Sequence, residues 1–301
     1  MLMKDRTESD ELKTLRLLNS RMILPPNAKN RLANLEKGFQ GERMFDQLTK
    51  ELDSNMLVIN DLCLENNQSI YQFDTLIFSY ELIYLFEVKN YESDAYYEAD
   101  SFYTFSNNEL KNPLDQLKRN KSFLRQLLRS LGFQLPIEGY AIFINPEFTL
   151  YQSPKNSPII HPTQVNRFIK KLNHSSTKLN AMHMKTADRL IAMHQKHNPY
   201  TRLPSYKYEQ LTKGIMCPKC NSFITSAVIR KAQCNQYGYK EDIDSVILRS
   251  IEDMRLRFPN IIITTNNVYE WCNVIVSRKR VATILKEKLK LKGYGQWTYY
   301  E

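Results

Sequence analysis

The chain has 301 residues, of which 42% are hydrophobic and 25% charged, and it carries a formal net charge of +10. This composition excludes an intrinsically disordered chain and is typical of a globular protein with one large domain or two ordinary ones. No apolar run reaches the roughly 18 residues that a transmembrane helix needs. The positive charge favours a polyanionic partner, with nucleic acid ahead of an anionic membrane surface.

The N-terminal residues and the cysteines indicate a cytoplasmic protein. Residues 1–21 are charged throughout and lack the apolar stretch of a secretory signal. The five cysteines are an odd number in a long chain and do not predict a disulfide framework. We therefore expect a cytoplasmic location, no membrane partner and an ordinary core thiol at Cys63.

Helical and strand-like patterns alternate along the first half of the chain. Leucines at helical spacing predict a helix over residues 8–22, which the two following prolines end. A second amphipathic helix is expected from about residue 37 to 52. The β-branched and aromatic runs that follow predict strands at 56–59, 69–78 and 82–88, with turns at 65–68 and 79–81, and an aromatic hairpin at 96–105 with its turn at 106–108.

A helix and a strand complete this region. Asn112 as N-cap and Pro113 at the first helical position predict a helix that extends to about residue 131. One face of that helix is rich in leucine and the other is basic. A strand at residues 140–144 follows. The order of helix, three strands, helix and strand predicts an α/β sandwich with a central mixed sheet.

Two carboxylates and a lysine on neighbouring strands point to phosphodiester hydrolysis, which needs a metal held by carboxylates and a cation that orients the attacking water. Glu87 and Lys89 lie two positions apart in a strand, so they project from the same face, while Val88 points into the core. Hairpin pairing can bring Asp74 beside Glu87. An acid about a dozen positions before Glu-x-Lys also arises by chance, but here the charges interrupt strongly apolar strands.

Four motifs, taken together and in order, resemble the nuclease-related domain (NERD) family, whose members are similar to PD-(D/E)xK nucleases in their predicted core. The resemblance covers roughly residues 37–155 and implies a PD-(D/E)xK nuclease-like sandwich. The motifs are Lys37-Gly38-Phe39-Gln40-Gly41-Glu42, Gln72-Phe73-Asp74, Phe86-Glu87-Val88-Lys89-Asn90 and Asn112-Pro113-Leu114-Asp115-Gln116.

The resemblance also implies roles for individual residues. Asp74 and Glu87 would be metal ligands, with the Val88 carbonyl as a third ligand and Glu42 as a further carboxylate. The metal would be Mg²⁺ or Mn²⁺. Lys89 would orient or help to activate the attacking water.

Gln116 has two interpretations. It resembles the active-site glutamine of RecB-like relatives, but those relatives often continue Gln-x-x-x-Tyr, and Asn120 stands here in place of the tyrosine. The alternative is an exposed helix residue. Gly38 and Gly41 are expected to permit a close approach of the backbone near the start of their helix.

The segment after residue 160 contains a degenerate zinc ribbon. Residues 161–196 are expected to be helical and residues 197–204 to form a linker. Cys217 and Cys220 then form a CxxC knuckle, and Cys234 follows at a suitable distance, but Tyr237 occupies the place of the fourth ligand. The sequence leaves open whether Zn²⁺ binds these three cysteines or a reduced fold keeps the ribbon shape without metal.

Residues 241–301 fit a small, mainly α-helical module of the helix-turn-helix or winged-helix type. Helices are expected at residues 242–257, 266–273 and 278–291, followed by a terminal strand or wing at 297–300. The last helix is basic, which favours nucleic-acid contact over an ordinary surface helix. The expected nucleic-acid contacts of the whole chain are Lys118, Arg119, Lys121, Arg125, Arg278, Lys279, Arg280 and Lys286.

These features together predict a divalent-metal-dependent deoxyribonuclease. RNA is an alternative substrate, and a homodimer would suit double-strand cleavage. The main rival is a catalytically silent DNA-binding or adaptor protein that uses the nuclease fold as a scaffold, although the intact Asp74, Glu87 and Lys89 argue against it. The expected segments are an N-terminal helical extension (1–36), the nuclease-like domain (37–160), a helical segment and linker (161–205), the degenerate ribbon (206–240) and the helix-turn-helix module (241–301).

Overall fold

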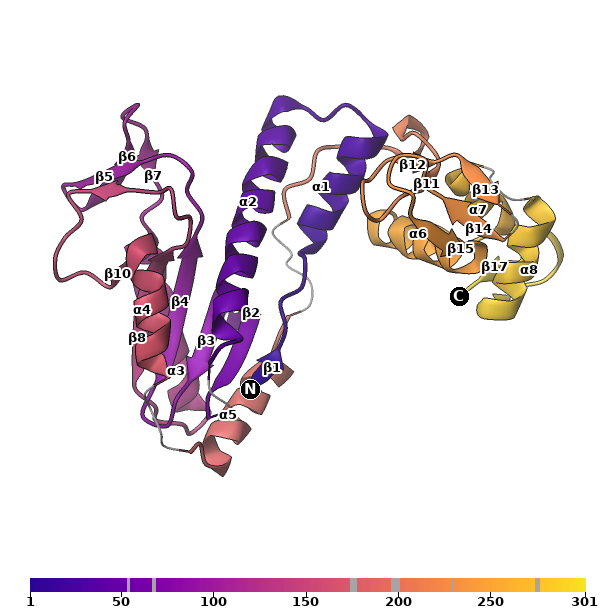
Figure 1. Cartoon of the computed structure of the whole chain (residues 1–301). Coiled ribbons are helices and arrows are strands. Elements are labelled where there is room, and N and C mark those ends of the chain that lie inside the picture. The colour runs from indigo at the N-terminus through magenta and orange to yellow at the C-terminus, as the bar shows by residue number, and fades with distance from the viewer. Residues whose placement is uncertain (53–54, 67–68, 174–177, 196–200, 229, 274–276) are drawn as a thin grey trace. The chain divides into compact units, whose positions relative to one another are not determined.

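The computed structural model describes residues 1–301 except 53–54, 67–68, 174–177, 196–200, 229 and 274–276. Contacts divide the chain into two units, one of residues 1–9 and 33–200 and one of residues 10–32 and 201–301 (Figure 1). The helical extension expected at residues 1–36 is therefore divided between the two units. The expected turn at 65–68 and linker at 197–204 lie partly outside the described residues.

The first unit is built on a six-stranded mixed sheet. β2, β3 and β4 are antiparallel neighbours, β1 is parallel to β2, and β8 is parallel to both β4 and β10. The expected α/β sandwich with a central mixed sheet is confirmed. The sheet order is β1 (Leu2–Lys4), β2 (Leu57–Asn66), β3 (Ser69–Phe78), β4 (Ile83–Lys89), β8 (Ile137–Phe143) and β10 (Ile159–Ile160).

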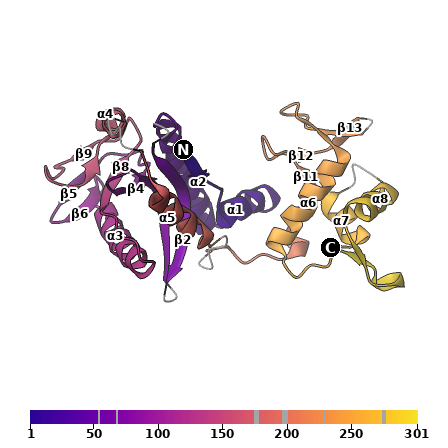
Figure 2. The same ribbon diagram turned by 90° about the horizontal axis from the view of Figure 1, so that it is seen from below.

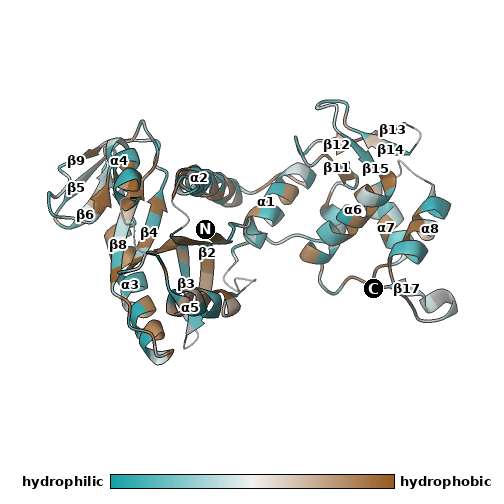
Figure 3. Cartoon of the chain, turned by 60° about the horizontal axis from the view of Figure 1, so that its bottom comes forward, coloured by the Kyte–Doolittle hydropathy of each residue, from teal (hydrophilic) through white to brown (hydrophobic). Residues whose placement is uncertain are grey.

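Helices cover both faces of this sheet (Figure 2). Each helix has an apolar stripe that it buries against the strands, and Figure 3 shows hydrophobic and hydrophilic residues alternating along α3. One face carries α2 (Pro26–Thr49) and α4 (Pro162–Leu172), and the other carries α3 (Pro113–Ser130) and α5 (Ala181–Ala192).

Strand β4 contributes to both interfaces between sheet and helices. Ile83 and Leu85 belong to the hydrophobic cluster beneath α3 and α5, whereas Phe86 and Val88 belong to the cluster beneath α2 and α4. Successive side chains of a strand point to opposite faces, so this division follows from the sequence. Glu87 and Lys89, the next two odd-numbered positions of β4, therefore lie on the α3 side of the sheet.

A smaller four-stranded sheet contains the expected aromatic hairpin, but its turn differs from the prediction. Ala99 and Asp100 form the turn with positive φ angles of 46° and 62°, and residues 105–108 instead connect β6 to β7. The prediction was wrong because Ser-Asn-Asn is a stronger turn signal than Ala-Asp. The order is β7 (Glu109–Leu110), β6 (Ser101–Thr104), β5 (Ala95–Glu98) and β9 (Leu150–Tyr151).

The second unit combines helices with short strands. Its helices are α1 (Asp10–Arg21), α6 (Ile243–Arg257), α7 (Thr265–Cys272) and α8 (Arg278–Lys288), with 3₁₀ helices η1 (Tyr208–Gln210) and η2 (Gly295–Trp297). Its strands are β11 (Ile215–Met216), β12 (Phe223–Ile224), β13 (Ser226–Val228), β14 (Lys231–Gln233), β15 (Lys240–Asp242), β16 (Leu291–Lys292) and β17 (Tyr299–Tyr300).

The starts of the last two helices, α7 and α8, follow from their N-capping residues. The side chains of Thr264 and Ser277 accept hydrogen bonds from backbone N–H groups of the first turns of α7 and α8, as Thr and Ser do at N-caps. α8 ends at Lys288 rather than at the expected residue 291, because residues 291–292 form the strand β16 that pairs with β17. No helix within the described ranges is long and apolar enough to cross a membrane.

Arg21, the last residue of α1, joins that helix to the rest of the second unit. Its guanidinium is buried, donates to the carbonyls of Thr212 (2.7 Å) and Gly214 (2.8 Å), and lies 4.1 Å from the ring centroid of Trp271. Burial lowers the pKa of Arg21 to about 10. Removing this side chain would leave two carbonyls of the unit without their donor.

We therefore predict that Arg21→Met lowers the free energy of unfolding of the second unit by about 2–4 kcal/mol. The matched control is Arg255→Met, because the Arg255 side chain is 35% exposed and pairs with Glu252, which is 70% exposed, and such pairs contribute at most about 1 kcal/mol. Urea denaturation followed by tryptophan fluorescence measures both changes. Equal effects of the two substitutions would contradict the role assigned to Arg21.

Candidate active site

Strands β3 and β4 separate where the expected catalytic residues lie. Their antiparallel ladder ends at the pair Thr75–Phe86, while β4 stays paired with β8 as far as Lys89. Beyond the last pair, the backbone N–H of Val88 donates to Oδ2 of Asp74 at 2.7 Å. The Asp74 side chain thus takes the place of a strand carbonyl and is fixed at the fork between the two strands.

Glu87 and Lys89 form a close ion pair next to this fork. The Nζ of Lys89 donates to Oε1 of Glu87 at 2.6 Å, and the Glu87 side chain is only 1% exposed. The second carboxylate oxygen, Oε2, is buried and has no hydrogen-bond partner among the described residues. Because such an oxygen is costly to bury alone, this position is suited to a cation or a water molecule.

Helix α3 brings Gln116 to the same place. The Nζ of Lys89 also approaches Oε1 of Gln116 at 3.4 Å, so Gln116 is half-buried at the site rather than a freely exposed helix residue. One turn later, the buried Asn120 donates from Nδ2 to the carbonyl of Gln72 at 2.9 Å. Asn120 therefore anchors α3 to β3 near the fork, at the position where RecB-like relatives often have a tyrosine.

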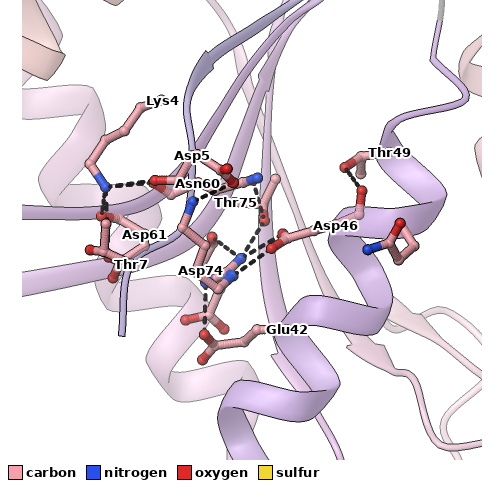
Figure 4. Close-up of polar contacts among 12 residues, drawn as sticks. Lys4, Asp5, Thr7, Glu42, Asp46, Thr49, Asn60, Asp61, Asp74 and Thr75 are labelled. Carbon is pink, nitrogen blue, oxygen red and sulfur yellow. Dashed lines mark hydrogen bonds and ion pairs between the residues drawn. The ribbon is translucent and has the colours of Figure 1, made fainter. Parts of the chain in front are cut away.

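Glu42 and Asp46 of α2 approach the same fork and share a partner, Arg6, that the sequence analysis missed. Arg6 donates to Glu42 Oε2 at 2.7 Å, to both oxygens of Asp46 at 2.9 and 3.0 Å, and to the carbonyl of Asp74 at 2.8 Å. Figure 4 shows Glu42, Asp46 and Asp74 gathered together. The local sequence carries no signal for this role, because Arg6 follows a three-residue strand and its partners lie far along the chain.

Burial and mutual repulsion perturb the ionisation of these groups. Burial and the nearby Asp74 carboxylate raise the pKa of Glu42 to about 8 and that of Glu87 to about 7, and burial raises the pKa of Asp74 as well. Burial opposes the charge of Lys89, but the carboxylates of Glu87 and Asp74 outweigh it and raise its pKa above the usual value. Crowded carboxylates of this kind are typical of functional sites.

These residues fit a divalent cation in part. Carboxylate oxygens are the ligands that Mg²⁺ and Mn²⁺ prefer, Oε2 of Glu87 is unpartnered, and the Asp74 carboxylate contributes to the raised pKa of Glu87. Among the described residues, however, Glu42, Asp74 and Glu87 do not form a set of three ligand atoms within 4.8 Å. Asp74 and Glu87 would therefore be the better ligand pair, and Glu42 would have to leave Arg6 to join them.

Part of the first unit is similar to a known protein family. A model described as nuclease-related domain matches residues 37–144, just over a third of the chain. We refer to residues 37–144, which match this model, as the nuclease-related domain. Comparisons with curated proteins and with solved structures gave no match.

The nuclease-related domain presents the expected basic face of α3 to solvent. Lys118, Arg119 and Arg125 are exposed and Lys121 is half-buried. In the second unit, the four expected residues of α8 are also exposed: Arg278, Lys279, Arg280 and Lys286. Arg278 contacts Asn266, and Arg280 forms an ion pair with Asp244 at 2.5 Å.

Gly41 lets α2 of the nuclease-related domain approach the end of β4. A Cβ atom at Gly41 would lie 2.4 Å from Cβ of Asn90, the residue after Lys89, whereas a Cβ at Gly38 would meet nothing within 4 Å. Asn90 also donates to the carbonyl of Lys37 on the same helix at 2.8 Å. The close approach expected at both glycines is thus found only at Gly41, in the middle of the helix rather than near its start.

This contrast yields a matched pair of substitutions. Gly38→Ala should stabilise the protein by about 0.5–1 kcal/mol, because alanine favours a helix interior over glycine. Gly41→Ala should instead destabilise it by about 1–3 kcal/mol, because the helix must move away from Asn90. Thermal or urea unfolding measures both changes, and the same sign for the two substitutions would contradict the close approach at Gly41.

Proposed function

We propose that the nuclease-related domain hydrolyses phosphodiester bonds of DNA in a divalent-metal-dependent reaction. The observation that carries this proposal is the fork between β3 and β4, where Asp74 is fixed by the Val88 N–H beside Glu87 and Lys89. One oxygen of Glu87 is buried there without a donor. A structural ion pair would not need a second buried carboxylate next to it, because the two negative charges repel each other.

The side chains of the site would have different roles in this reaction. Asp74 and Glu87 would hold Mg²⁺ or Mn²⁺, which would supply the positive charge that stabilises the phosphorane-like transition state. Lys89 binds Glu87 and Gln116 through its ammonium, and an ammonium has three donors. One N–H of Lys89 therefore remains to orient the attacking water or a phosphate oxygen.

Glu42 and Gln116 act at the edge of this site. Gln116 limits the movement of the Lys89 ammonium from the side of α3, so it is a positioning residue. Glu42 is held by Arg6 at 2.7 Å, and it would add a carboxylate only when that ion pair opens. The two residues should therefore influence rate and metal affinity less than Asp74 and Glu87 do.

The basic face of α3 supports DNA as the polyanion. Lys118, Arg119 and Arg125 are exposed on the helix whose first turn carries Gln116, so phosphates bound along α3 would lead toward Lys89. Such contacts would fix the position of the strand without reading its sequence. The exposed basic residues of α8 offer a second surface of the same kind in the other unit.

The decisive experiment is cleavage of supercoiled plasmid, single-stranded DNA and single-stranded RNA with Mg²⁺, Mn²⁺ or EDTA. Asp74→Asn, Glu87→Gln and Lys89→Met should each lower the rate by about a hundredfold or more. The matched controls are Glu138→Gln and Lys155→Met, which change exposed residues of the same unit and should keep full activity.

Metal binding is measured on the same variants as a rise in melting temperature with Mg²⁺. Wild type and Lys89→Met should show this rise, and Asp74→Asn should lose it, because Asp74 is a proposed ligand and Lys89 is not. If the protein cleaves RNA but not DNA, the proposed substrate is wrong and RNA takes its place. Purified protein that binds DNA but does not cleave it with either metal would favour a silent DNA-binding scaffold.

DNA binding can be tested separately through its dependence on salt. The double variant Lys118→Ala/Arg125→Ala should bind any DNA sequence more weakly, and the slope of log K against log salt should fall by about 2, one for each lost phosphate contact. The matched control is Arg167→Ala/Lys170→Ala, which removes two exposed cations of α4 on the opposite face of the sheet. Fluorescence anisotropy measures both slopes, and equal losses in the two variants would mean that α3 has no special part in binding.

A further inference from the structure

Two chain segments of the second unit form loops with the same backbone hydrogen bonds. In the first loop, the N–H of Cys217 donates to the carbonyl of Ser222 and the N–H of Asn221 donates back to the carbonyl of Cys217. In the second, Cys234 donates to Tyr239, and Gly238 donates back to Cys234. The residue after the fourth position has positive φ in both loops, 56° at Asn221 and 70° at Gly238.

In each loop, a backbone N–H also donates to the sulfur of the first cysteine. The N–H of Lys219 donates to Sγ of Cys217 at 3.4 Å, and the N–H of Tyr237 donates to Sγ of Cys234 at 3.3 Å. Backbone donors aimed at a sulfur stabilise a thiolate, which is the form of cysteine that binds metal.

The three sulfurs of these loops converge. The Sγ atoms of Cys217, Cys220 and Cys234 all lie within 4.8 Å of one another, and those of Cys220 and Cys234 are 3.5 Å apart. A tetrahedral zinc ion with Zn–S bonds of about 2.3 Å separates its sulfur ligands by about 3.8 Å. Cys217 and Cys234 are fully buried, and Cys220 is half-buried.

The fourth corner of the cluster has no cysteine. Tyr237 occupies the position in the second loop that Cys220 occupies in the first, and it is 62% exposed. The Ser222 hydroxyl lies 3.0 Å from Sγ of Cys220 and 3.5 Å from Sγ of Cys234. An oxygen donor, either this hydroxyl or a water molecule that it binds, can therefore complete a four-coordinate site.

We propose that Cys217, Cys220 and Cys234 bind one zinc ion as three thiolates, with an oxygen donor next to Ser222 at the fourth position. The ion would tie the β11–β12 hairpin, which flanks the first loop, to the β13–β15 sheet, which contains the second. These strands are only two or three residues long, so a metal crosslink would supply stability that their own hydrogen bonds cannot. This inference does not rest on the proposed nuclease activity.

The first test is the metal content of the full chain purified under reducing conditions without added chelator. We expect about one equivalent of zinc per chain, and replacement by Co²⁺ should give a sulfur-to-cobalt charge-transfer band. Cys234→Ser should weaken zinc binding at least about a hundredfold and lower the melting temperature of the second unit. The matched control is Cys63→Ser, which changes a buried cysteine of the other unit and should keep the zinc.

The second test uses the likeness of the two loops. Tyr237→Cys should place a fourth thiolate on the ion, raise the cobalt charge-transfer absorbance by about a third and tighten zinc binding at least about tenfold. Ser222→Ala should keep the zinc with lower affinity. The proposal is overturned if wild type contains no zinc and develops no cobalt band, if Cys220 and Cys234 form a disulfide in the reduced preparation, or if Tyr237→Cys binds zinc no more tightly than wild type.

Discussion

The candidate active site depends on one hydrogen bond, from the backbone N–H of Val88 to the carboxylate of Asp74. At this point β4 still pairs with β8 but no longer with β3, so a buried N–H needs another acceptor. Asp74 satisfies it, and the separation of the strands makes room for α3 to enter beside Lys89. The end of the pairing between β3 and β4 therefore both opens the sheet and positions the Asp74 carboxylate.

Much of this arrangement follows from local sequence. The two-residue period of β4 predicts that Glu87 and Lys89 share a face and that Val88 enters the core, and the hydrophobic clusters agree with this. Asn112 caps α3 through its side chain, as its position before a proline predicts. These features could be predicted because each depends on residues within a few positions of one another.

The parts that could not be predicted depend on contacts over long distances in the sequence. Arg6 reaches Glu42, Asp46 and Asp74 across 36 to 68 positions, and no local period marks it. The convergence of the cysteines is similar, because Tyr237 breaks the expected spacing of a second CxxC pair while the backbone of that loop keeps its shape. A spacing motif depends on which side chains are present, whereas the backbone shape of this loop depends on Gly238 and its hydrogen bonds.

The division of the chain into interleaved units has a consequence for synthesis on the ribosome. Helix α1 belongs to the unit that is completed by residues 201–301, and its Leu12, Leu15 and Leu18 are fully buried there. At about 5–20 residues per second, these leucines wait roughly ten to fifty seconds for their partners, while the nuclease-related domain can already fold. The apolar face of α1 therefore stays without its final partners for most of the time in which the chain is synthesised.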